Sequence, residues 1–315
     1  MTALKNSSID AILQDCPSAR AVAQIALDAW PEHDKFLVRS FRQRSPQMLS
    51  AGESVAAAVL ELIAGEERRF GEDYRWTCDR LREEEIFFHR EGRYRLSTFA
   101  DAYAEVYSDH AYMRRYVSGL LLSQVLWYNH VATMEMFLSR VLGETTEPFD
   151  YLEIGPGHGL MTYFAAASNL SRSLEAWDVS AASLTETDAA LKKLGASKTV
   201  ALVETDIMQA GAAKKRFDLV VVSEVLEHLE TPGRALRFLR SAIAEGGRIF
   251  INVPINSPSP DHLYLFSSPE EVAALVMDAG LRVERMETYA TQGRPVETAL
   301  AQKISVSAGV VARPA

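Results

Sequence analysis

The sequence predicts an α/β protein in which a doubly wound parallel sheet follows a mostly helical N-terminal part. Two observations predict this fold. Residues 1–146 place apolar side chains mainly at helical spacing, whereas short β-rich runs alternate with helical ones over residues 147–315. Alternating strands and helices imply βαβ units, whose right-handed crossovers cover both faces of a sheet. We therefore expect two domains that meet near Glu147.

The composition narrows the range of partners. The chain has 315 residues, 48% hydrophobic and 24% charged, as in ordinary soluble globular proteins. Its formal net charge of -9 disfavours nucleic acid and anionic membranes, because phosphates are bound mainly by Lys and Arg. Two cysteines, Cys16 and Cys78, offer no disulfide framework. With no visible signal peptide or membrane-spanning run, a cytoplasmic location is expected.

Three segments of the N-terminal part show helical periodicity: 19–30, 54–65 and the long 113–143. Residues 86–97 (IFFHREGRYRLS) interrupt it, because their alternating pattern around Glu91-Gly92 is typical of a two-stranded hairpin. Helices followed by a hairpin suggest a winged helix, which often binds DNA. The acidic charge instead favours a dimerisation or substrate-covering domain.

Seven β-rich runs are expected to form the sheet. The last two have only a loop between them, which predicts an antiparallel pair at one edge. The runs are 149–154, 173–178, 199–204, 217–222, 247–253, 281–290 and 303–312.

Glycines follow the first strand, at the edge of the sheet where ligands of doubly wound folds bind. Gly155, Gly157 and Gly159 are spaced G-x-G-x-G, not in the G-x-G-x-x-G pattern that holds a pyrophosphate. Glycine permits positive φ and a close approach of a ligand to the backbone. The preceding Glu153 would repel pyrophosphate but could organise a cationic ligand.

Acidic residues end the next strands in order. Asp178 could accept both hydroxyls of a ribose, and Asp206 could accept an adenine amino hydrogen with Ile207 against the ring. Ser223 and Glu224 end the fourth strand beside the same crevice. Each of these residues could instead cap a helix, but four in order at strand ends favour a ligand site.

This ordered set resembles the class I S-adenosylmethionine-dependent methyltransferases over roughly residues 149–314. The resemblance implies a Rossmann-like seven-stranded sheet and a catalytic domain over 147–315. It implies that Glu153 and the three glycines line the methionine part of the cofactor, that Asp178, followed by Val179, holds the ribose, and that Asp206 and Ile207 hold the adenine. The runs SEVLEHL and EGGRIFINVP resemble the ubiquinone-pathway O-methyltransferases. Domain 1–146 is similar, more weakly, to the dimerisation domain of small-molecule O-methyltransferases, which allows a homodimer.

Candidate catalytic residues follow the fourth and fifth strands. Glu224, Glu227 and His228 would share one face of a helix at i, i+3 and i+4, and His262 lies on the same edge. Two carboxylates and two imidazoles can bind a divalent metal ion, and a similar set occurs in small-RNA 3′-terminal 2′-O-methyltransferases. The alternative is that these side chains cap and pack. Without a metal, His228 is the expected general base.

The substrate is expected under the long loop 252–271, with Asn256, His262 and Tyr264 pointing inward. Across the crevice, the long helix offers Tyr128, His130 and Met134, although such a stripe is also typical of a core. His158, within the glycine loop, could contact cofactor or substrate, but a solvent-facing position is favoured.

The sequence thus predicts an S-adenosylmethionine-dependent methyltransferase that acts on a small molecule in specialised metabolism, with a metal ion as an open alternative. A nicotinamide-dependent oxidoreductase, an RNA methyltransferase and a winged-helix regulator are competing hypotheses.

Overall fold

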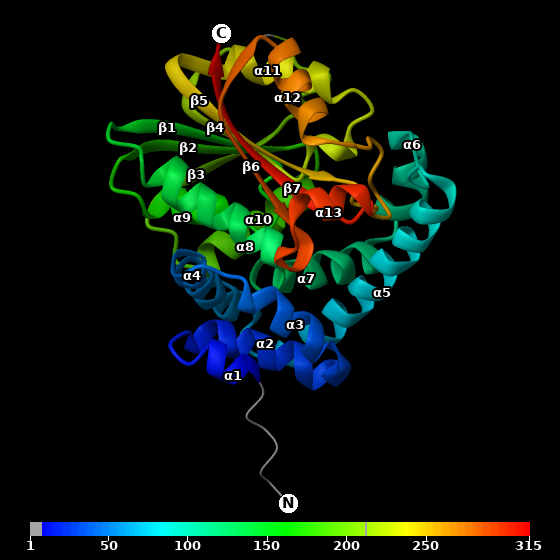
Figure 1. Cartoon of the computed structure of the whole chain (residues 1–315). Coiled ribbons are helices and arrows are strands. Elements are labelled where there is room, and N and C mark those ends of the chain that lie inside the picture. Colours follow the sequence, from blue (N-terminus) through cyan, green and yellow to red (C-terminus); the bar gives the residue numbers. More distant parts are fainter. Residues whose placement is uncertain (1–7, 212) are drawn as a thin grey trace, which may run out of the picture.

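The structure, a computed structural model, describes residues 8–211 and 213–315. Its N-terminal part is a layer of helices that packs against the sheet, with the first helices farthest from it (Figure 1). The helices of this layer are α1 (Ser8–Ile12), α2 (Pro17–Ala29), α3 (Asp34–Arg42), α4 (Pro46–Ile63), α5 (Glu67–Glu91), α6 (Phe99–Ala102), α7 (His110–Leu126) and α8 (Tyr128–Met136), with π-helical turns η2 (Tyr103–Tyr107) and η3 (Phe137–Leu142).

The predicted hairpin at 86–97 is wrong. Helix α5 continues to Glu91 and ends at Gly92, whose φ of 71° is left-handed and whose N–H donates to the Phe88 carbonyl. The pair Glu91-Gly92 is therefore a helix C-cap, a position that glycine favours for the same conformational reason as a hairpin turn. Without the hairpin, the winged-helix interpretation has no support.

The predicted long helix over 113–143 is broken at Trp127, whose backbone is extended with φ of -96° and ψ of 135°. Helix α7 ends before it and helix α8 begins after it. This break brings the Trp127 indole N–H within 2.9 Å of the Tyr74 hydroxyl on α5. The periodicity indicated helix on both sides of Trp127 but gave no sign of the break.

The sheet confirms the predicted seven-stranded doubly wound fold. Its order is β3-β2-β1-β4-β5-β7-β6, and β7 runs antiparallel to both of its neighbours. The predicted antiparallel pair at one edge is confirmed, but helix α13 (Val296–Ala301) lies between its strands instead of a plain loop. The strands are β1 (Phe149–Ile154), β2 (Ser171–Asp178), β3 (Val200–Glu204), β4 (Phe217–Ser223), β5 (Ile243–Ile255), β6 (Leu281–Ala290) and β7 (Val306–Pro314).

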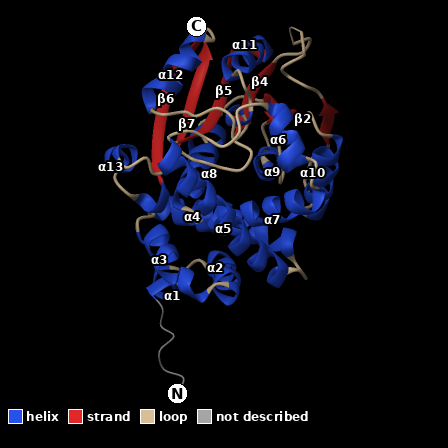
Figure 2. Cartoon of the chain, turned by 90° about the vertical axis from the view of Figure 1, so that its right-hand side faces the viewer, coloured by secondary structure: helices blue, strands red, loops and turns tan. Residues whose placement is uncertain are grey.

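Alternating side chains of the central strands enter two different cores. On β4, Leu219 and Val221 join the core that contains α9 (Leu160–Ala167) and much of the helical layer. Val220 and Val222 join the core formed with α11 (Pro232–Ala242) and α12 (Pro269–Asp278) on the other face. Figure 2 shows these helices on the two sides of the sheet, and α10 (Ala181–Lys193) beside α9.

The first core runs without interruption from the helical layer into the sheet, so the boundary at 146/147 stays a prediction. Strand β1 begins at Phe149, close to the predicted point. Within the described residues, no single helix is long and apolar enough to cross a membrane; α4 and α5 would meet that length and composition only as a pair, which is bent by 113°.

Candidate functional site

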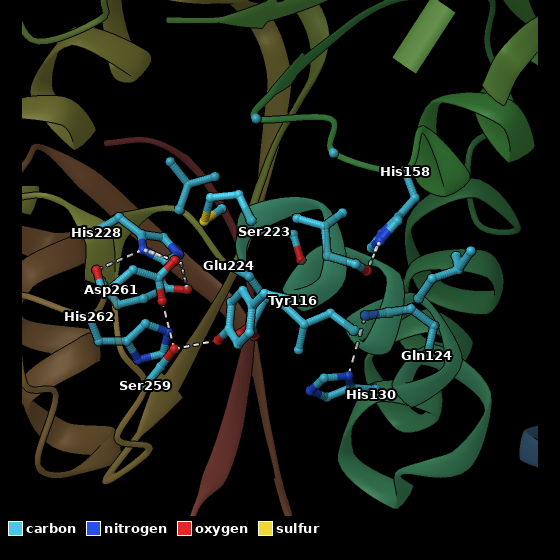
Figure 3. Close-up of a pocket in the computed structure, with 18 of the residues that line it drawn as sticks. Tyr116, Gln124, His130, His158, Ser223, Glu224, His228, Ser259, Asp261 and His262 are labelled. Atoms are coloured by element: carbon cyan, nitrogen blue, oxygen red, sulfur yellow. Dashed lines mark hydrogen bonds and ion pairs between the residues drawn. The ribbon is translucent and has the colours of Figure 1, made fainter. Parts of the chain in front are cut away.

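A cavity of about 2460 Å³ lies between the carboxyl ends of the strands and the helical layer. Its sheet side is lined by the glycine loop and by the residues that follow β2, β3 and β4, and its other side by α5, η2, α7 and α8. Figure 3 shows His228, Asp261 and His262 on one side, His130 and Gln124 on the other, and Tyr116 between them. The predicted edge of the sheet thus forms one wall of a cavity that is open to solvent at its rim.

The glycine loop has the geometry that a close ligand requires. Gly155 has φ of 64°, and a Cβ atom there would lie 2.6 Å from Cγ2 of Val225. Gly157 has φ of 50°, and a Cβ there would have no described atom within 4 Å. Gly155 is therefore needed for packing against the loop after β4, whereas Gly157 leaves open space beside the backbone.

Glu153, directly before the loop, is buried and lines the cavity. The Tyr151 hydroxyl donates to its Oε2 at 2.9 Å, and the Thr162 hydroxyl donates to the same oxygen. Burial raises the pKa of Glu153 to about 7, although both hydroxyl donors oppose that shift. The carboxylate is thus fixed by its own chain at the end of β1.

Both strand-end aspartates make the local bonds of a cap. Asp178 accepts from the Ser180 N–H and from the Ser183 hydroxyl, each at 2.8 Å. Asp206 accepts from the Met208 N–H and from Nε2 of Gln209, each at 2.8 Å. An ionised carboxylate has about four acceptor sites, so these bonds leave room for ligand hydroxyls or amines. Asp178 and Asp206 line the cavity, as do Val179, Ile207 and Ser223.

A comparison with known families agrees with this arrangement. The family model described as a methyltransferase domain matches residues 127–288, from the start of α8 into β6. The chain belongs to this methyltransferase family. It is a class I S-adenosylmethionine-dependent methyltransferase, and the oxidoreductase hypothesis is set aside.

Individual relatives are distant. Protein syc1184_c of Synechococcus sp. is 30% identical over 102 residues, which are 32% of this chain and 24% of that relative. The chain is also similar to BH2331 of Bacillus halodurans C-125 (TM-score 0.47, 15% identity, 56% of this chain and 97% of that one). It is similar to the N-methyltransferase NodS of Bradyrhizobium japonicum WM9, solved with S-adenosyl-L-homocysteine (TM-score 0.43, 19% identity, 57% and 85%).

Three of the four residues predicted to bind a metal ion lie close together in the structure. Glu227, His228 and His262 place one ligand atom each within 4.8 Å of one another. They do so without the predicted α-helix, because Leu226–His228 is a single 3-10 turn and Glu224 has a left-handed φ of 52°. Glu224 accepts from Nδ2 of Asn252 at 2.7 Å and is not part of this group of three.

The two histidines are oriented alike. Nδ1 of His228 lies 3.1 Å from the Asp261 carbonyl, and Nδ1 of His262 lies 2.7 Å from the Ser257 carbonyl. A carbonyl only accepts, so each Nδ1 carries a hydrogen, and Nε2 is the ring nitrogen left for a further ligand. Burial and the neighbouring His228 lower the pKa of His262 to about 4, which keeps it neutral. The Nε2 lone pair of His262 is therefore available to an electrophile or a proton.

Glu227 completes this arrangement. Its carboxylate is fully buried, and neither oxygen has a hydrogen-bond partner in the described part of the chain. Oε1 lies 3.7 Å from Nε2 of His228. Burial, followed by the charge of Glu224, raises the pKa of Glu227 well above its ordinary value. A buried carboxyl without partners is costly, so this group needs a ligand or a proton.

Sequence reasoning missed a hydrogen-bonded chain behind His228. Asp261 accepts from the Ser259 hydroxyl at 2.6 Å, and Ser259 lies 2.5 Å from the Tyr116 hydroxyl on α7. The Tyr107 hydroxyl lies 3.4 Å from Oδ2 of Asp261 and 3.2 Å from Nδ1 of His228. Burial opposes ionisation of Asp261, but His228, His262 and the Ser259 hydroxyl hold its pKa below the ordinary value. The adjacent SPDH motif could have indicated Asp261.

Several predicted substrate residues lie elsewhere. Tyr128 packs with Met48 and Val131 on the other side of α8. Tyr264 donates its hydroxyl to Glu271, and Asn256 is buried and donates its backbone N–H to the Phe266 carbonyl. None of these three is among the residues that line the cavity, so the structure does not bring them to the predicted substrate site. For Tyr128 it agrees with the alternative that the stripe belongs to a core.

The remaining predictions on this side have mixed outcomes. His130 and Met134 of α8 line the cavity, and Nδ1 of His130 lies 3.0 Å from the Ser123 hydroxyl. His158 is not a free solvent-facing residue, because its Nε2 lies 3.0 Å from the Val117 carbonyl of α7 and donates to it. The glycine loop is thereby joined to the helical layer.

Proposed function

We propose that this methyltransferase transfers a methyl group to a hydroxyl of a small molecule, and that Glu227, His228 and His262 hold a divalent metal ion at the acceptor. One observation carries the proposal: the unpartnered carboxylate of Glu227 and the free Nε2 atoms of the two histidines converge. Metal-binding histidines typically donate their other ring N–H to a carbonyl or carboxylate, as both do here.

The donor set fits such an ion. One carboxylate and two imidazoles suit Mn²⁺, Fe²⁺, Co²⁺, Ni²⁺ or Zn²⁺. When bound, the ion would lower the pKa of an acceptor hydroxyl and so replace a strong general base. Glu224, held by Asn252, would add negative charge behind Glu227.

The cofactor would occupy the sheet edge of the cavity. The open space at Gly157 would admit its methionine part, Asp178 with Val179 would hold the ribose, and Asp206 with Ile207 would hold the adenine. Ser223 and Glu224 at the end of β4 would then lie between the cofactor and the metal ligands. The protein's main contribution is alignment, because the sulfonium is already a strong electrophile and the methyl moves in line to the acceptor oxygen.

The test measures the amount of bound metal and the rate of methyl transfer, both with the whole chain. After dialysis against chelator, we expect loss of bound metal and of S-adenosylhomocysteine formation with 3,4-dihydroxybenzoate, and recovery on addition of Mn²⁺. Glu227→Gln and His262→Ala should bind no metal and be inactive. His110→Ala is the matched control for metal binding, since His110 lines the cavity but is not part of the cluster.

Two outcomes would change the assignment. Turnover that survives chelator, together with an active His262→Ala variant, would exclude the metal and leave His228 as general base.

An RNA acceptor is the alternative tested alongside, with a short RNA carrying a free 3′-terminal diol. The net charge of -9 opposes it, because no phosphate-binding excess of Lys and Arg is present. A dimer stays a prediction, tested by light scattering.

A further inference from the structure

We propose that the methyl acceptor is an elongated amphipathic molecule: its hydroxyl end reaches the Glu227–His228–His262 cluster and its apolar body lies along helices α5, α6 and α7. This proposal rests on the proposed function and adds the chemical class of the substrate. It depends on three features of the cavity, namely its size, the side chains of its helical wall and the hydrophobic residues at its rim.

The cavity is larger than one cofactor and a compact acceptor require. Its volume of about 2460 Å³ exceeds the roughly 300–1,000 Å³ of ordinary small-molecule pockets. The cofactor residues occupy only the sheet edge, from the glycine loop to the end of β4. The remaining space extends under the helical layer, so it is available to a second, long ligand.

The wall of this remaining space carries many apolar side chains among charged ones. It is formed by one face of α5, by the segment from α6 to η2, and by the facing side of α7. Representative lining residues are Leu81, Ile86, Phe99, Tyr103, Met113 and Leu120. The segment from α6 to η2 is tied to the catalytic part, because the Phe99 N–H donates to Oε1 of Glu230 at 2.8 Å and Tyr107 reaches the cluster. The apolar wall is therefore continuous with the polar cluster.

Hydrophobic exposure is concentrated at the rim of this cavity. Six large hydrophobic residues are exposed among those described. Four of them belong to the helical wall of the cavity: Ile86 (59%), Phe99 (46%), Tyr103 (57%) and Val117 (38%). Val179 (55%) also lines the cavity, but it lies on the sheet side beside Asp178, where the proposed function puts the ribose. The sixth, Met277, is 56% exposed on α12, away from it. Exposed apolar residues that gather in one place mark a binding surface, whereas single ones need no explanation.

An apolar chain on this rim would cover these side chains and remove its own surface from water. The outer rim also carries Arg82, Glu85 and Arg114, so the far end of the ligand would meet solvent and charged groups. A long acceptor with one polar end at the cluster satisfies both parts of the cavity. A compact polar acceptor would leave the apolar wall uncovered.

The experiment uses 4-alkylcatechols of increasing chain length, below their micelle concentrations, with the full-length protein and S-adenosylhomocysteine. Calorimetry should show Kd falling by up to about three- to fourfold per added methylene. Ile86→Ser and Phe99→Ser should reduce this gain. Met277→Ser is the matched control, an exposed hydrophobic residue outside the cavity, and should leave the gain unchanged.

Long-chain alcohols without a catechol separate this inference from the proposed function. If they bind with the same gain per methylene while no catechol is methylated, the apolar site stands and the proposed acceptor chemistry fails. If short and long catechols are methylated with equal Kd, the proposed chemistry stands and the elongated substrate is refuted. Equal loss of the gain in Met277→Ser would also refute it, because the effect would then not depend on the cavity.

Discussion

Burial shifts the pKa values of two carboxyls at the sheet edge and of two imidazoles in the helical layer in opposite directions. At the sheet edge, burial raises the pKa of Glu153 and of Glu224 to about 7. In the helical layer, burial lowers the pKa of His33 and of His130 to about 4. Burial favours the neutral form in both regions. The difference teaches that near pH 7 the two buried imidazoles of the helical layer are settled as neutral, whereas Glu153 and Glu224 at the sheet edge can still gain negative charge when a cationic ligand arrives.

The largest expected effect is an opposite dependence of stability on pH. Glu153 titrates at 4.5 when unfolded and about 7 when folded, so its contribution is full below pH 4.5 and is lost as pH rises through 7. His33 titrates at 6.5 when unfolded and about 4 when folded, so its contribution is full above pH 6.5 and is lost as pH falls through 4. Each shift corresponds to at most about 3 kcal/mol.

Urea unfolding of single variants between pH 4 and 8 separates the two. Glu153→Gln, whose amide oxygen can still accept from Tyr151 and Thr162, should remove part of the decline toward high pH. His33→Gln, whose amide can still reach the Tyr74 hydroxyl, should remove part of the decline toward low pH. If both variants changed the curve on the same side, the contrast between the regions would be wrong.

A matched pair of glycines sharpens the comparison at the level of ligand binding. Gly157 in the cofactor loop and Gly65 in the helical layer both have positive φ, 50° and 85°, and a Cβ at either would have no described atom within 4 Å. An alanine adds the same kind of backbone strain at both. Gly157→Ala should weaken S-adenosylhomocysteine binding by about 10- to 100-fold, because overpacking typically costs 1–3 kcal/mol. Gly65→Ala should bind normally in calorimetry; equal affinities for the two variants would remove Gly157 from the cofactor site.

The two regions also differ in what their sequence reveals. The shared location of the glycine loop, Asp178 and Asp206 could be predicted because each lies at or just after the end of a strand, and parallel strands bring their carboxyl ends to one edge. Their roles toward the cofactor stay predictions. The alternating pattern over 86–97 predicted a hairpin wrongly, because a glycine such as Gly92 is as typical of a helix C-cap as of a hairpin turn. Tyr107 and Tyr116 could not be found, because their contacts to Asp261 and Ser259 depend on how helices far along the chain dock. The positions of Tyr128 and Tyr264 could not be decided, because neither helical periodicity nor loop length shows which way a side chain points.

The smallest expected effect tests whether the helical layer takes part in the chemistry. Tyr107 comes from that layer, and its hydroxyl contacts both His228 and Asp261. In Tyr107→Phe the ring is kept, so the apolar wall is preserved, but His228 loses a partner that restricts its rotation. We expect Mn²⁺ affinity and kcat to fall by about fivefold, below the 10- to 100-fold range for typical partners of metal ligands, because the Asp261 carbonyl still holds Nδ1.

Affinity for S-adenosylhomocysteine should not change, since Tyr107 contacts none of the cofactor residues in the hydrogen bonds described. Tyr103→Phe is the control, an exposed tyrosine of the same segment. A merely structural role for Tyr107 would lower thermal stability and leave metal affinity intact, and that result would confine the chemistry to the sheet edge.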